Sequence, residues 1–283
     1  MKSLYNLILV NILILIAIFN VYKQYPDQKL RFIQCDVGQG DAVLITKGFT
    51  QILIDSGEDN QVLSCLQKHM PFWDKKINLV IATHPDKDHI GGFDEIATIY
   101  SIALFVDNGA DLDKEESINL SKLLVDQHIL IKHVQDLDQV KINGIEVDFI
   151  WPKNKDENKS LAIYGLNNDN EASIVTKIKY QQFSALVTGD IPLEVENELV
   201  KINEDLESLV LKVAHHGSKY SSSQMFLQMV NPQIATIGVG KNSYGHPDKE
   251  IVEFLKNLGT KVYRTDEVGD VVLVWDNDKV ALE

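Results

Sequence analysis

The segment "ATHPDKDHIGG" (residues 82–92) places two histidines and two aspartates within six positions, directly after the apolar run "INLVI". A single histidine at a strand end is usually a polar cap, but four potential ligands so close together are costly to desolvate unless a cation neutralises them. His84 and Asp86 alternate and can point to one side of an extended chain, whereas Asp88 and His89 fall on the following turn. The segment therefore predicts a metal site.

Three more apolar runs end in the same kinds of residue. "ILIDSG" ends in Asp55, "ALVTGD" in Asp190, and "LKVAHHGS" in the pair His215 and His216. Asp55 alone is typical of a turn, and Asp190 could cap a helix that follows. Two adjacent histidines are unusual in a core. Together these residues supply enough ligands for two ions, and we expect them at one rim of the sheets.

Two glycine-containing segments add candidates around this rim. In "DVGQGD", Asp36 is predicted to hydrogen-bond to the ligands, while the role of Asp41 stays open. "GKNSYGHPDKE" presents His246 in a Gly-His-Pro turn, either as a general acid, as a phosphate contact or as an ordinary exposed histidine. Three other histidines stand singly and are interpreted as structural: His69, His128 and His133.

The elements that must position these residues alternate between strands and helices. From residue 30 onward, "LRFIQCD", "DAVLIT" and "QILIDS" are typical of strands, and "NQVLSCLQKHM" has helical spacing. A second series of the same kind follows a polar, Asn-rich stretch at residues 152–170. Two such halves predict an α/β fold in which two sheets pack face to face with helices outside.

The composition is that of an ordinary globular protein with an acidic balance. Of 283 residues, 45% are hydrophobic and 24% are charged, and the formal net charge is −14. The charge argues against a dedicated basic surface for nucleic acid. It does not exclude a nucleic-acid substrate at a site where divalent ions reverse the local sign. Cys35 and Cys65 are the two cysteines, and we expect buried free thiols rather than a disulfide.

The N-terminal segment is different in kind. Residues 4–22 are uncharged and apolar except for three asparagines. As a helix they would extend about 28 Å, close to the ~30 Å hydrocarbon core of a bilayer. With no obvious cleavage site, residues 1–26 predict an uncleaved single-pass anchor and short linker rather than a signal peptide or a core helix. Residues 27–283 then form one domain.

The side of the membrane follows less directly from the sequence. Lys2 precedes the apolar segment, whereas Lys23, Lys29 and Arg31 follow it, and this charge count alone would leave the domain in the cytoplasm. A long domain after a short N-terminal segment is nevertheless often translocated. We therefore expect an extracytoplasmic domain.

The motifs in this order resemble the metallo-β-lactamase superfamily, whose signature is H-x-H-x-D-H with a later Asp and His. Asp86 stands where that signature usually has its second histidine. With "DVGQGDAVLI", "VTGD" and "VAHHGSKYSSS", this variant is similar to the C-terminal domain of the ComEC DNA-uptake family. The resemblance covers residues 30–283. It implies an αββα four-layer sandwich, here preceded by one transmembrane helix in place of that family's long channel domain.

The resemblance also implies the ligands of two divalent ions, Zn²⁺ or Mn²⁺, the latter because carboxylates are numerous. The implied metal ligands are His84, Asp86, Asp88, His89, Asp190 as the bridge, and His215 or His216, of which we assign His215. The implied catalytic residues are Asp88, which would orient the attacking water, His246 and His216. Asp169, Asn170 and Ser173 occupy the place of the superfamily's missing middle histidine. Residues expected to support the ligands or contact substrate are Asp36, Asp41, Asp55, Asn170, Ser173 and Ser218.

The implied function is that of a metal-dependent phosphodiesterase or nuclease that acts on DNA during competence. Two alternatives stay open. One is a hydrolase of small esters, lactones, thioesters or β-lactams that uses the same ions. The other is a non-catalytic accessory subunit of a DNA-uptake machine. An open groove would favour nucleic acid and a closed pocket a small ester, and the sequence identifies no protein partner.

Overall fold

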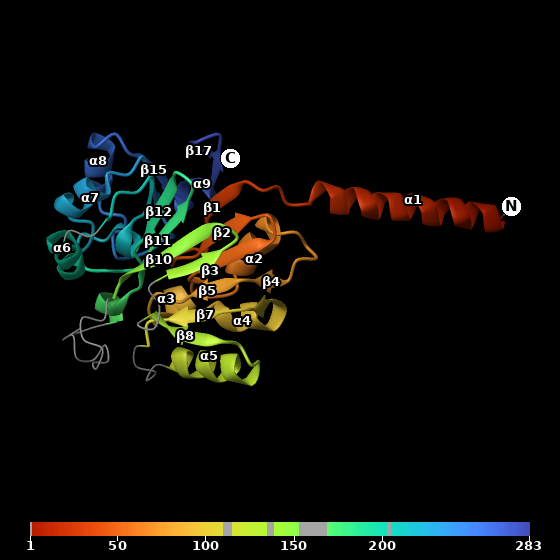
Figure 1. Cartoon of the computed structure of the whole chain (residues 1–283), viewed down its shortest axis with the longest axis horizontal. Helices are drawn as coiled ribbons and strands as arrows, with labels where there is room; N and C mark the ends of the chain where they lie inside the picture. The colour runs from red at the N-terminus through yellow and green to blue at the C-terminus, as the bar shows by residue number, and fades with distance from the viewer. Residues whose placement is uncertain (1, 110–114, 135–138, 153–168, 203–204) are drawn as a thin grey trace.

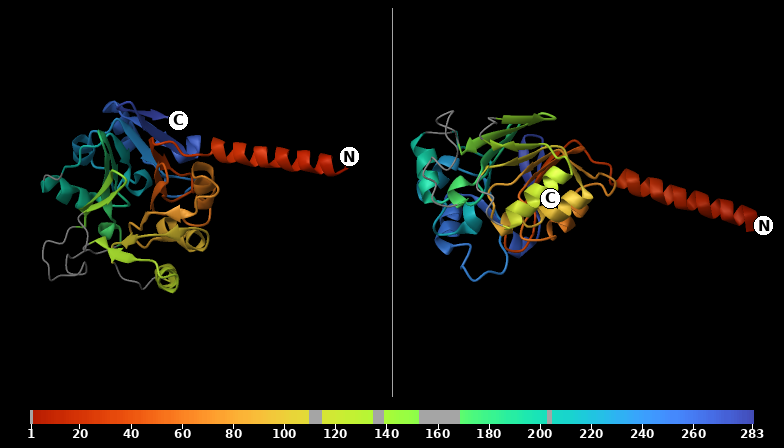
Figure 2. Two further views of the ribbon diagram at one scale, coloured as in Figure 1. Left: turned by 45° about the vertical axis from the view of Figure 1, so that its right-hand side comes forward. Right: turned by 90° about the horizontal axis from the view of Figure 1, so that it is seen from below.

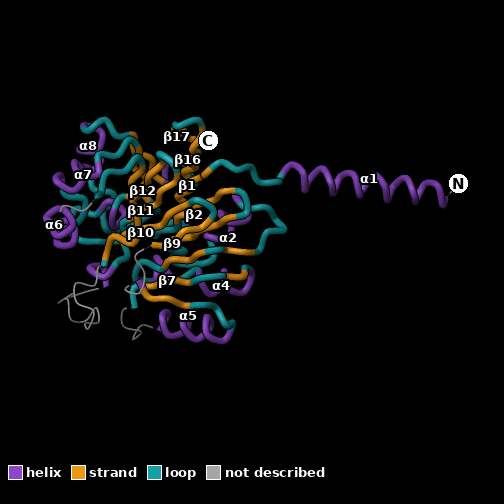
Figure 3. Tube along the Cα trace, viewed as in Figure 1, coloured by secondary structure: helices purple, strands orange, loops and turns teal. Residues whose placement is uncertain are grey.

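The computed structural model describes residues 2–109, 115–134, 139–152, 169–202 and 205–283. Two large β-sheets lie at the centre of the described part, and helices cover their outer faces (Figure 1). Figure 3 shows the same layering, with strands in the middle and most helices at the periphery. The predicted αββα arrangement is confirmed.

The first sheet combines strands from the two ends of the domain. Its order is β17 (Lys279–Leu282), β16 (Val271–Asp276), β1 (Leu30–Gln34), β2 (Val43–Lys47), β3 (Thr50–Ile54), β5 (Leu79–Ile81), β7 (Phe105–Asp107) and β8 (Ile131–His133). Strands β17 to β3 are antiparallel, whereas β3, β5, β7 and β8 are parallel. The parallel strands therefore deliver their carboxyl ends to one edge.

The second sheet has its parallel part at the other end. Its order is β15 (Lys261–Arg264), β14 (Ile234–Ile237), β13 (Val210–Lys212), β12 (Phe183–Val187), β11 (Val175–Tyr180), β10 (Ile145–Trp151) and β9 (Gln139–Ile142). Strands β12 to β15 are parallel. Their carboxyl ends supply the second half of the rim at which the candidate ligands collect.

Alternation of side chains along the strands explains the layers. In β2, Leu44 packs into the outer core of the first sheet, whereas its neighbours Val43 and Ile45 pack between the two sheets. Leu44 pairs with Leu53 of β3, and Ile45 pairs with Ile52. Because side chains alternate with a period of two, a slip of one residue would exchange the two cores. Both faces of these strands are apolar, as a doubly covered sheet requires.

The helices fill the two outer layers. α2 (Val62–His69), α4 (Phe93–Ile99) and α5 (Glu115–Asp126) contribute Leu66, Ile96 and Leu120 to the outer core of the first sheet. α6 (Leu193–Lys201), α7 (Gln224–Val230) and α8 (Lys249–Asn257) cover the second sheet. The remaining short elements are α3 (Lys87–Ile90), β4 (Lys76–Ile77), β6 (Ser101–Ile102), η3 (Asp169–Ala172), η4 (Ala214–Gly217) and α9 (Thr265–Val268).

One helix stands apart from these layers. α1 (Lys2–Lys23) projects from the body of the domain in all three views (Figures 1 and 2). Its segment Leu4–Lys23 has a mean hydropathy of 2.4 and is long and apolar enough to cross a membrane. The linker after it is held to the domain, because Gly48 N donates to Asp27 O and Phe72 N donates to Gln24 Oε1.

The expectation of free thiols is wrong, because Cys35 and Cys65 form a disulfide. Cys35 follows β1 and Cys65 lies on α2, and packing of the helix on the sheet brings their Cα atoms to 5.8 Å. That separation is ordinary for a disulfide. The two cysteines are 30 positions apart, so their spacing does not predict the bond. The bond depends on the packing of α2 on the sheet.

Candidate metal centre

Strand ends from both sheets meet at one rim. In the first sheet, Asp55 follows β3 and His84 follows β5, and the short helix α3 carries His89. In the second sheet, Asp190 follows β12, and the turn η4 after β13 carries His216. The sheets face each other, so residues far apart in sequence become neighbours here.

Four buried side chains form the centre of this rim: Asp41, His89, Asp190 and His216. Each offers a ligand atom, and these atoms all lie within 4.8 Å of one another. His89 Nε2 is 3.3 Å from Asp190 Oδ1, and His216 Nε2 is 3.6 Å from Asp190 Oδ2. The ring of His84 lies against that of His89, with centroids 4.1 Å apart. We call these five residues the metal group.

Several atoms of the metal group lack the partners that buried polar atoms normally have. His84 Nε2, His89 Nε2 and Asp190 Oδ1 are buried and accept or donate no hydrogen bond within the described residues. Leaving a buried polar group unsatisfied costs about 1–3 kcal/mol. Divalent cations would satisfy these atoms, so the residues present fit a metal site.

Asp55 and Thr83 set the orientation of two of these histidines. Thr83 Oγ1 donates to Asp55 Oδ2, 2.8 Å away, and therefore accepts the Nδ1–H of His84 at 3.0 Å. His89 Nδ1 donates to the same Asp55 oxygen at 2.8 Å. Both rings consequently point Nε2 towards the metal group. A carboxylate behind a metal-binding histidine is a common way of fixing its tautomer.

The backbone of Gly238 holds both His216 and Asp41 in position. His216 Nδ1 donates to the carbonyl of Gly238 at 2.8 Å, which leaves Nε2 facing Asp190. A Cβ atom at Gly238 would lie 2.2 Å from Asp41 Oδ1, so a larger residue cannot occupy this position without displacing Asp41. Gln34 Nε2 donates to that same oxygen at 3.1 Å.

Lys212 is a member of the site that sequence reasoning missed. The side chain of Lys212 is buried, and its Nζ forms an ion pair with Asp41 Oδ2. The same Nζ lies 3.5 Å from Asp190 Oδ1 and donates to Gly189 O at 2.8 Å. Burial acts to lower the pKa of Lys212, but the charges of Asp41 and Asp190 raise it, so the ammonium stays protonated. A lysine inside the apolar run "SLVLKVA" was the available signal.

The charges of the metal group are strongly coupled. Burial acts to lower the pKa of His89, yet the carboxylates of Asp190 and Asp55 raise it well above the usual range. Burial acts to raise the pKa of Asp190, yet His89, His216 and Lys212 lower it well below the usual range. Without metal, protons on the histidines balance the buried carboxylate. Metal binding must therefore displace those protons.

Two further predicted ligands sit at the edge of the metal group. His216 Nε2 is 3.2 Å from Asp88 Oδ2, and His84 Nε2 is 3.4 Å from Asp86 Oδ2. The side chains of Asp86 and Asp88 are both 35% exposed. Burial acts to raise the pKa of Asp88, but His216 and His89 hold it below the ordinary value. Both carboxylates face the group from its solvent side.

The structure separates the two adjacent histidines. His216 is buried within the metal group, whereas the side chain of His215 is 30% exposed and its Nε2 lies 3.8 Å from Asp190 Oδ2. The sequence assignment had His215 as ligand and His216 as catalytic residue, and the positions suit the opposite roles. His246 lies next to His215, with ring centroids 5.7 Å apart. Burial lowers the pKa of both His215 and His246, which favours their neutral forms.

Some of the residues expected to support the ligands contact the metal group, and others do not. Ser173 Oγ accepts from Asp190 N at 3.2 Å, so Ser173 helps to hold Asp190 in place. Asn170 O accepts from Ser173 N, and Ser218 Oγ accepts from Tyr220 N. Asp36 is exposed, and its carboxylate accepts from Gly38 N rather than from a member of the metal group.

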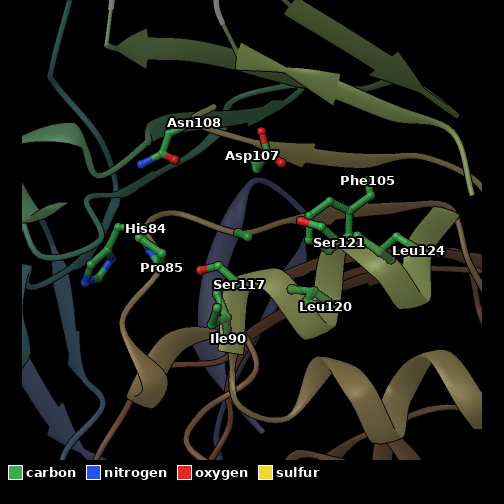
Figure 4. A pocket seen from close by; sticks show the side chains of 11 residues that line it. His84, Pro85, Ile90, Phe105, Asp107, Asn108, Ser117, Leu120, Ser121 and Leu124 are labelled. Atoms are coloured by element: carbon green, nitrogen blue, oxygen red, sulfur yellow. The ribbon is translucent and has the colours of Figure 1, made fainter. Parts of the chain in front are cut away.

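A small pocket adjoins His84 (Figure 4). Its apolar wall comes from Phe105 and from Leu120 and Leu124 of α5, and Ser117 lines it with a buried hydroxyl that has no hydrogen-bond partner within the described residues. The cavity volume is about 40 Å³. That is room for roughly two to four water molecules, far less than the ~300–1,000 Å³ of a typical ligand pocket.

Comparison with known families gives the site its context. Residues 35–241 match the metallo-beta-lactamase superfamily. The chain belongs to this superfamily. The metallo-beta-lactamase fold protein YhfI from Bacillus subtilis superposes with a TM-score of 0.60 at 12% identity, over 87% of this chain and 100% of YhfI. Igni18, a metallo hydrolase from Ignicoccus hospitalis, gives a TM-score of 0.56 at 14% identity, over 87% of this chain and 100% of Igni18.

Sequence relatives within the superfamily are competence and recombination proteins. ComE operon protein 3 of Bacillus subtilis is 26% identical over 261 residues, which is 86% of this chain and 32% of that protein. Competence protein ComA of Neisseria gonorrhoeae is 27% identical, over 86% of this chain and 32% of ComA. Recombination protein 2 of Haemophilus influenzae is 26% identical, over 93% of this chain and 31% of that protein. The chain spans about a third of the length of these relatives, and its predicted resemblance to the ComEC family is confirmed.

Substitution of Asp190 tests the metal group directly. Asp190→Ala removes the carboxylate that contacts His89, His216 and Lys212. We expect the purified variant to lose most bound metal in elemental analysis, whereas His128→Ala, on a turn after α5, should retain it. A folded wild-type chain that takes up neither Mn²⁺ nor Zn²⁺ would contradict the assignment.

Glu196 of α6 gives a prediction about stability and pH. Its buried carboxylate accepts hydrogen bonds from Ser222 N and, at 2.7 Å, from Ser223 N, and thereby holds the loop after His216. Burial raises the pKa of Glu196 from 4.5 to about 7, against the effect of these donors. The folded state thus binds the proton more tightly than the unfolded state. Stability should fall as pH rises from about 4.5 to 7, by about 3 kcal/mol for this group.

Glu196→Gln removes this titration. We expect the difference in unfolding free energy between variant and wild type to shift in favour of the variant by about 3 kcal/mol between pH 4.5 and 8. Chemical denaturation of both chains across this range measures it. A difference that does not change with pH would show that Glu196 titrates normally.

Proposed function

We propose that this chain is a membrane-anchored phosphodiesterase that binds two divalent ions, Mn²⁺ or Zn²⁺, and hydrolyses DNA. The observation that carries the proposal is the cluster of buried ligand atoms on His84, His89 and Asp190 that make no hydrogen bond within the described residues, in a chain similar to competence proteins. The acidic net charge is compatible with this function because the ions would supply the positive charge that a phosphate needs.

The donor set would divide between two ions, with Asp190 placed to contribute to both. His84 and Asp86, whose Nε2 and Oδ2 atoms are 3.4 Å apart, would hold one ion. His89, His216 and Asp88 would hold the other, since His216 Nε2 is 3.2 Å from Asp88 Oδ2. When bound, such ions act as Lewis acids towards a phosphoryl oxygen and make water nucleophilic at neutral pH.

The residues at the solvent side of the metal group would handle substrate and protons. Asp88 is ionised and partly exposed, so it can orient the attacking water and accept its proton. Water would attack phosphorus and the ester P–O bond would break. The proton that Asp88 takes from the water would then pass to the leaving oxygen, so that the protons balance. His215 and His246 are neutral at the rim, where their N–H groups would donate to phosphate oxygens. Lys212 would keep the buried carboxylates balanced during the reaction.

The small-ester alternative is less well supported. The pocket beside His84 has a volume of only about 40 Å³ and would not enclose a lactone or β-lactam. A non-catalytic role is also less well supported. Structural metal sites are closed by protein ligands, whereas Asp86, Asp88 and His215 are each about a third exposed here. An open rim suits a substrate that approaches from outside, such as a nucleic-acid strand.

We further propose that α1 anchors the domain on the extracytoplasmic side of a membrane. The helix is unburied over Leu4–Lys23 and is apolar enough to span a bilayer. Exposed aromatic residues, Tyr22 and Phe72, lie where the helix meets the domain, as is typical of a membrane interface. The Cys35–Cys65 disulfide supports this side, because disulfides persist in oxidising compartments.

Hydrolysis is tested with Asp88→Asn. The full chain in detergent, supplied with Mn²⁺ or Zn²⁺, should cleave DNA and should lose activity when a chelator is added. Asp88→Asn should lower kcat by about 10²–10⁴-fold, the usual contribution of a general base, with a smaller change in KM.

Asp36→Asn provides the matched control, because Asp36 is exposed and does not contact the metal group. It should retain wild-type activity. A metal-loaded wild type that opens a lactone or thioester but cleaves no phosphodiester would refute the phosphodiesterase proposal.

The location is tested by fractionation and thiol labelling. We expect the intact chain to stay in the membrane fraction after alkaline extraction and to keep its N-terminal segment. In denaturant, maleimide should label neither cysteine until a reductant is added. A soluble chain that begins after residue 22, or thiols that react without reduction, would contradict the anchored, extracytoplasmic arrangement.

A further inference from the structure

An exposed tyrosine stands on a rigid loop beside the metal group. Tyr244 is 75% exposed, within the segment 240–246 that follows β14. The side chain of Asn242 organises this loop. Its Oδ1 accepts from the backbone N–H groups of Tyr244, Gly245 and His246, and its Nδ2 donates to Gly240 O and His246 O. The exposure of Tyr244 is therefore built into the loop and does not result from a loose segment.

A series of ring contacts connects Tyr244 to the metal group. The Tyr244 ring stacks on His246, with centroids 5.8 Å apart and planes inclined by 24°. His246 contacts His215 at 5.7 Å, and His215 contacts His216 at 6.1 Å. One face of Tyr244 is thus supported by His246, while the side chain as a whole remains largely open to solvent.

We propose that Tyr244 stacks on an unpaired base of a nucleic-acid strand whose neighbouring phosphate lies at the metal group. This inference rests on the proposed phosphodiesterase function and adds a base-binding residue to it. Exposed aromatic rings are the usual platform for bases in single strands. Stacking is sequence-tolerant, since every base offers an aromatic face.

The surroundings of Tyr244 suit a single strand better than a duplex. Lys241 is exposed in the same loop, and Lys219 is exposed in the loop after His216, so both can approach the phosphate backbone. Bases inside a duplex are already stacked and would have to be extruded before they could meet the Tyr244 ring. We therefore expect Tyr244 to favour unpaired substrate.

The experiment compares two oligonucleotides with the same backbone. One is an ordinary single strand and the other is an abasic single strand of equal length, each cleaved by the full chain in detergent with Mn²⁺. Tyr244→Ala should raise KM for the ordinary strand by about 5- to 150-fold, which corresponds to the loss of one stacked base, and should leave kcat nearly unchanged. It should change KM for the abasic strand little.

Controls separate this inference from the function on which it rests. Tyr244→Trp should keep the wild-type KM, and Tyr25→Ala, which removes a tyrosine of similar exposure (64%) on the linker after α1, should have no effect. If wild type cleaves neither strand, the phosphodiesterase proposal fails. If wild type cleaves both and Tyr244→Ala raises KM for neither, or for both equally, the stacking assignment is wrong while the phosphodiesterase proposal stands.

Discussion

The buried carboxylate of Asp190 is the constraint on which this molecule depends. It lies between the two sheets' strand ends, within 3.3–3.8 Å of His89, Lys212, His215 and His216. A lone buried carboxylate would be prohibitively unfavourable, so the positive charges of Lys212, His89 and His216 are a condition of folding as well as of function. Protons on His89 and His216 can supply that charge before metal binds. The site can therefore form in the absence of metal.

The backbone around Asp190 is held in conformations that an unconstrained chain would avoid. His215 and His216 both have positive φ, at 50° and 52°. A residue other than glycine that adopts such a φ angle destabilises the fold by of the order of 1–3 kcal/mol. The turn is maintained by the donation of His216 Nδ1 to Gly238 O and by the fit of Gly238 against Asp41. The two histidines consequently point to different places, one into the metal group and one to its rim.

The sequence predicted the layers and the placement of most candidate ligands at strand ends because both depend on local patterns. Apolar runs that end in Asp55, His84, Asp190 or His216 place these residues at strand ends whatever the packing details. Asp41 and Lys212 were harder to assign, since their roles arise from an ion pair between residues 171 positions apart, one in the loop before β2 and the other at the end of β13. The disulfide likewise depends on where α2 packs. Which of His215 and His216 lies within the metal group depends on a left-handed turn that no spacing rule indicates, and the exposure of Asp36 depends on the direction of a loop.

The pairing of β1 with β16 has a consequence for how the first sheet assembles. β1 lies between β2 and β16, and its residue Phe32 pairs with Leu273, 241 positions further along the chain. Contacts between residues so far apart in sequence form slowly, because a long loop must close before they are made. Until β16 has paired, β1 is an open edge whose backbone groups can pair with another chain. A variant that weakens β16 would therefore expose an aggregation-prone edge in a sheet whose other strands can already be formed.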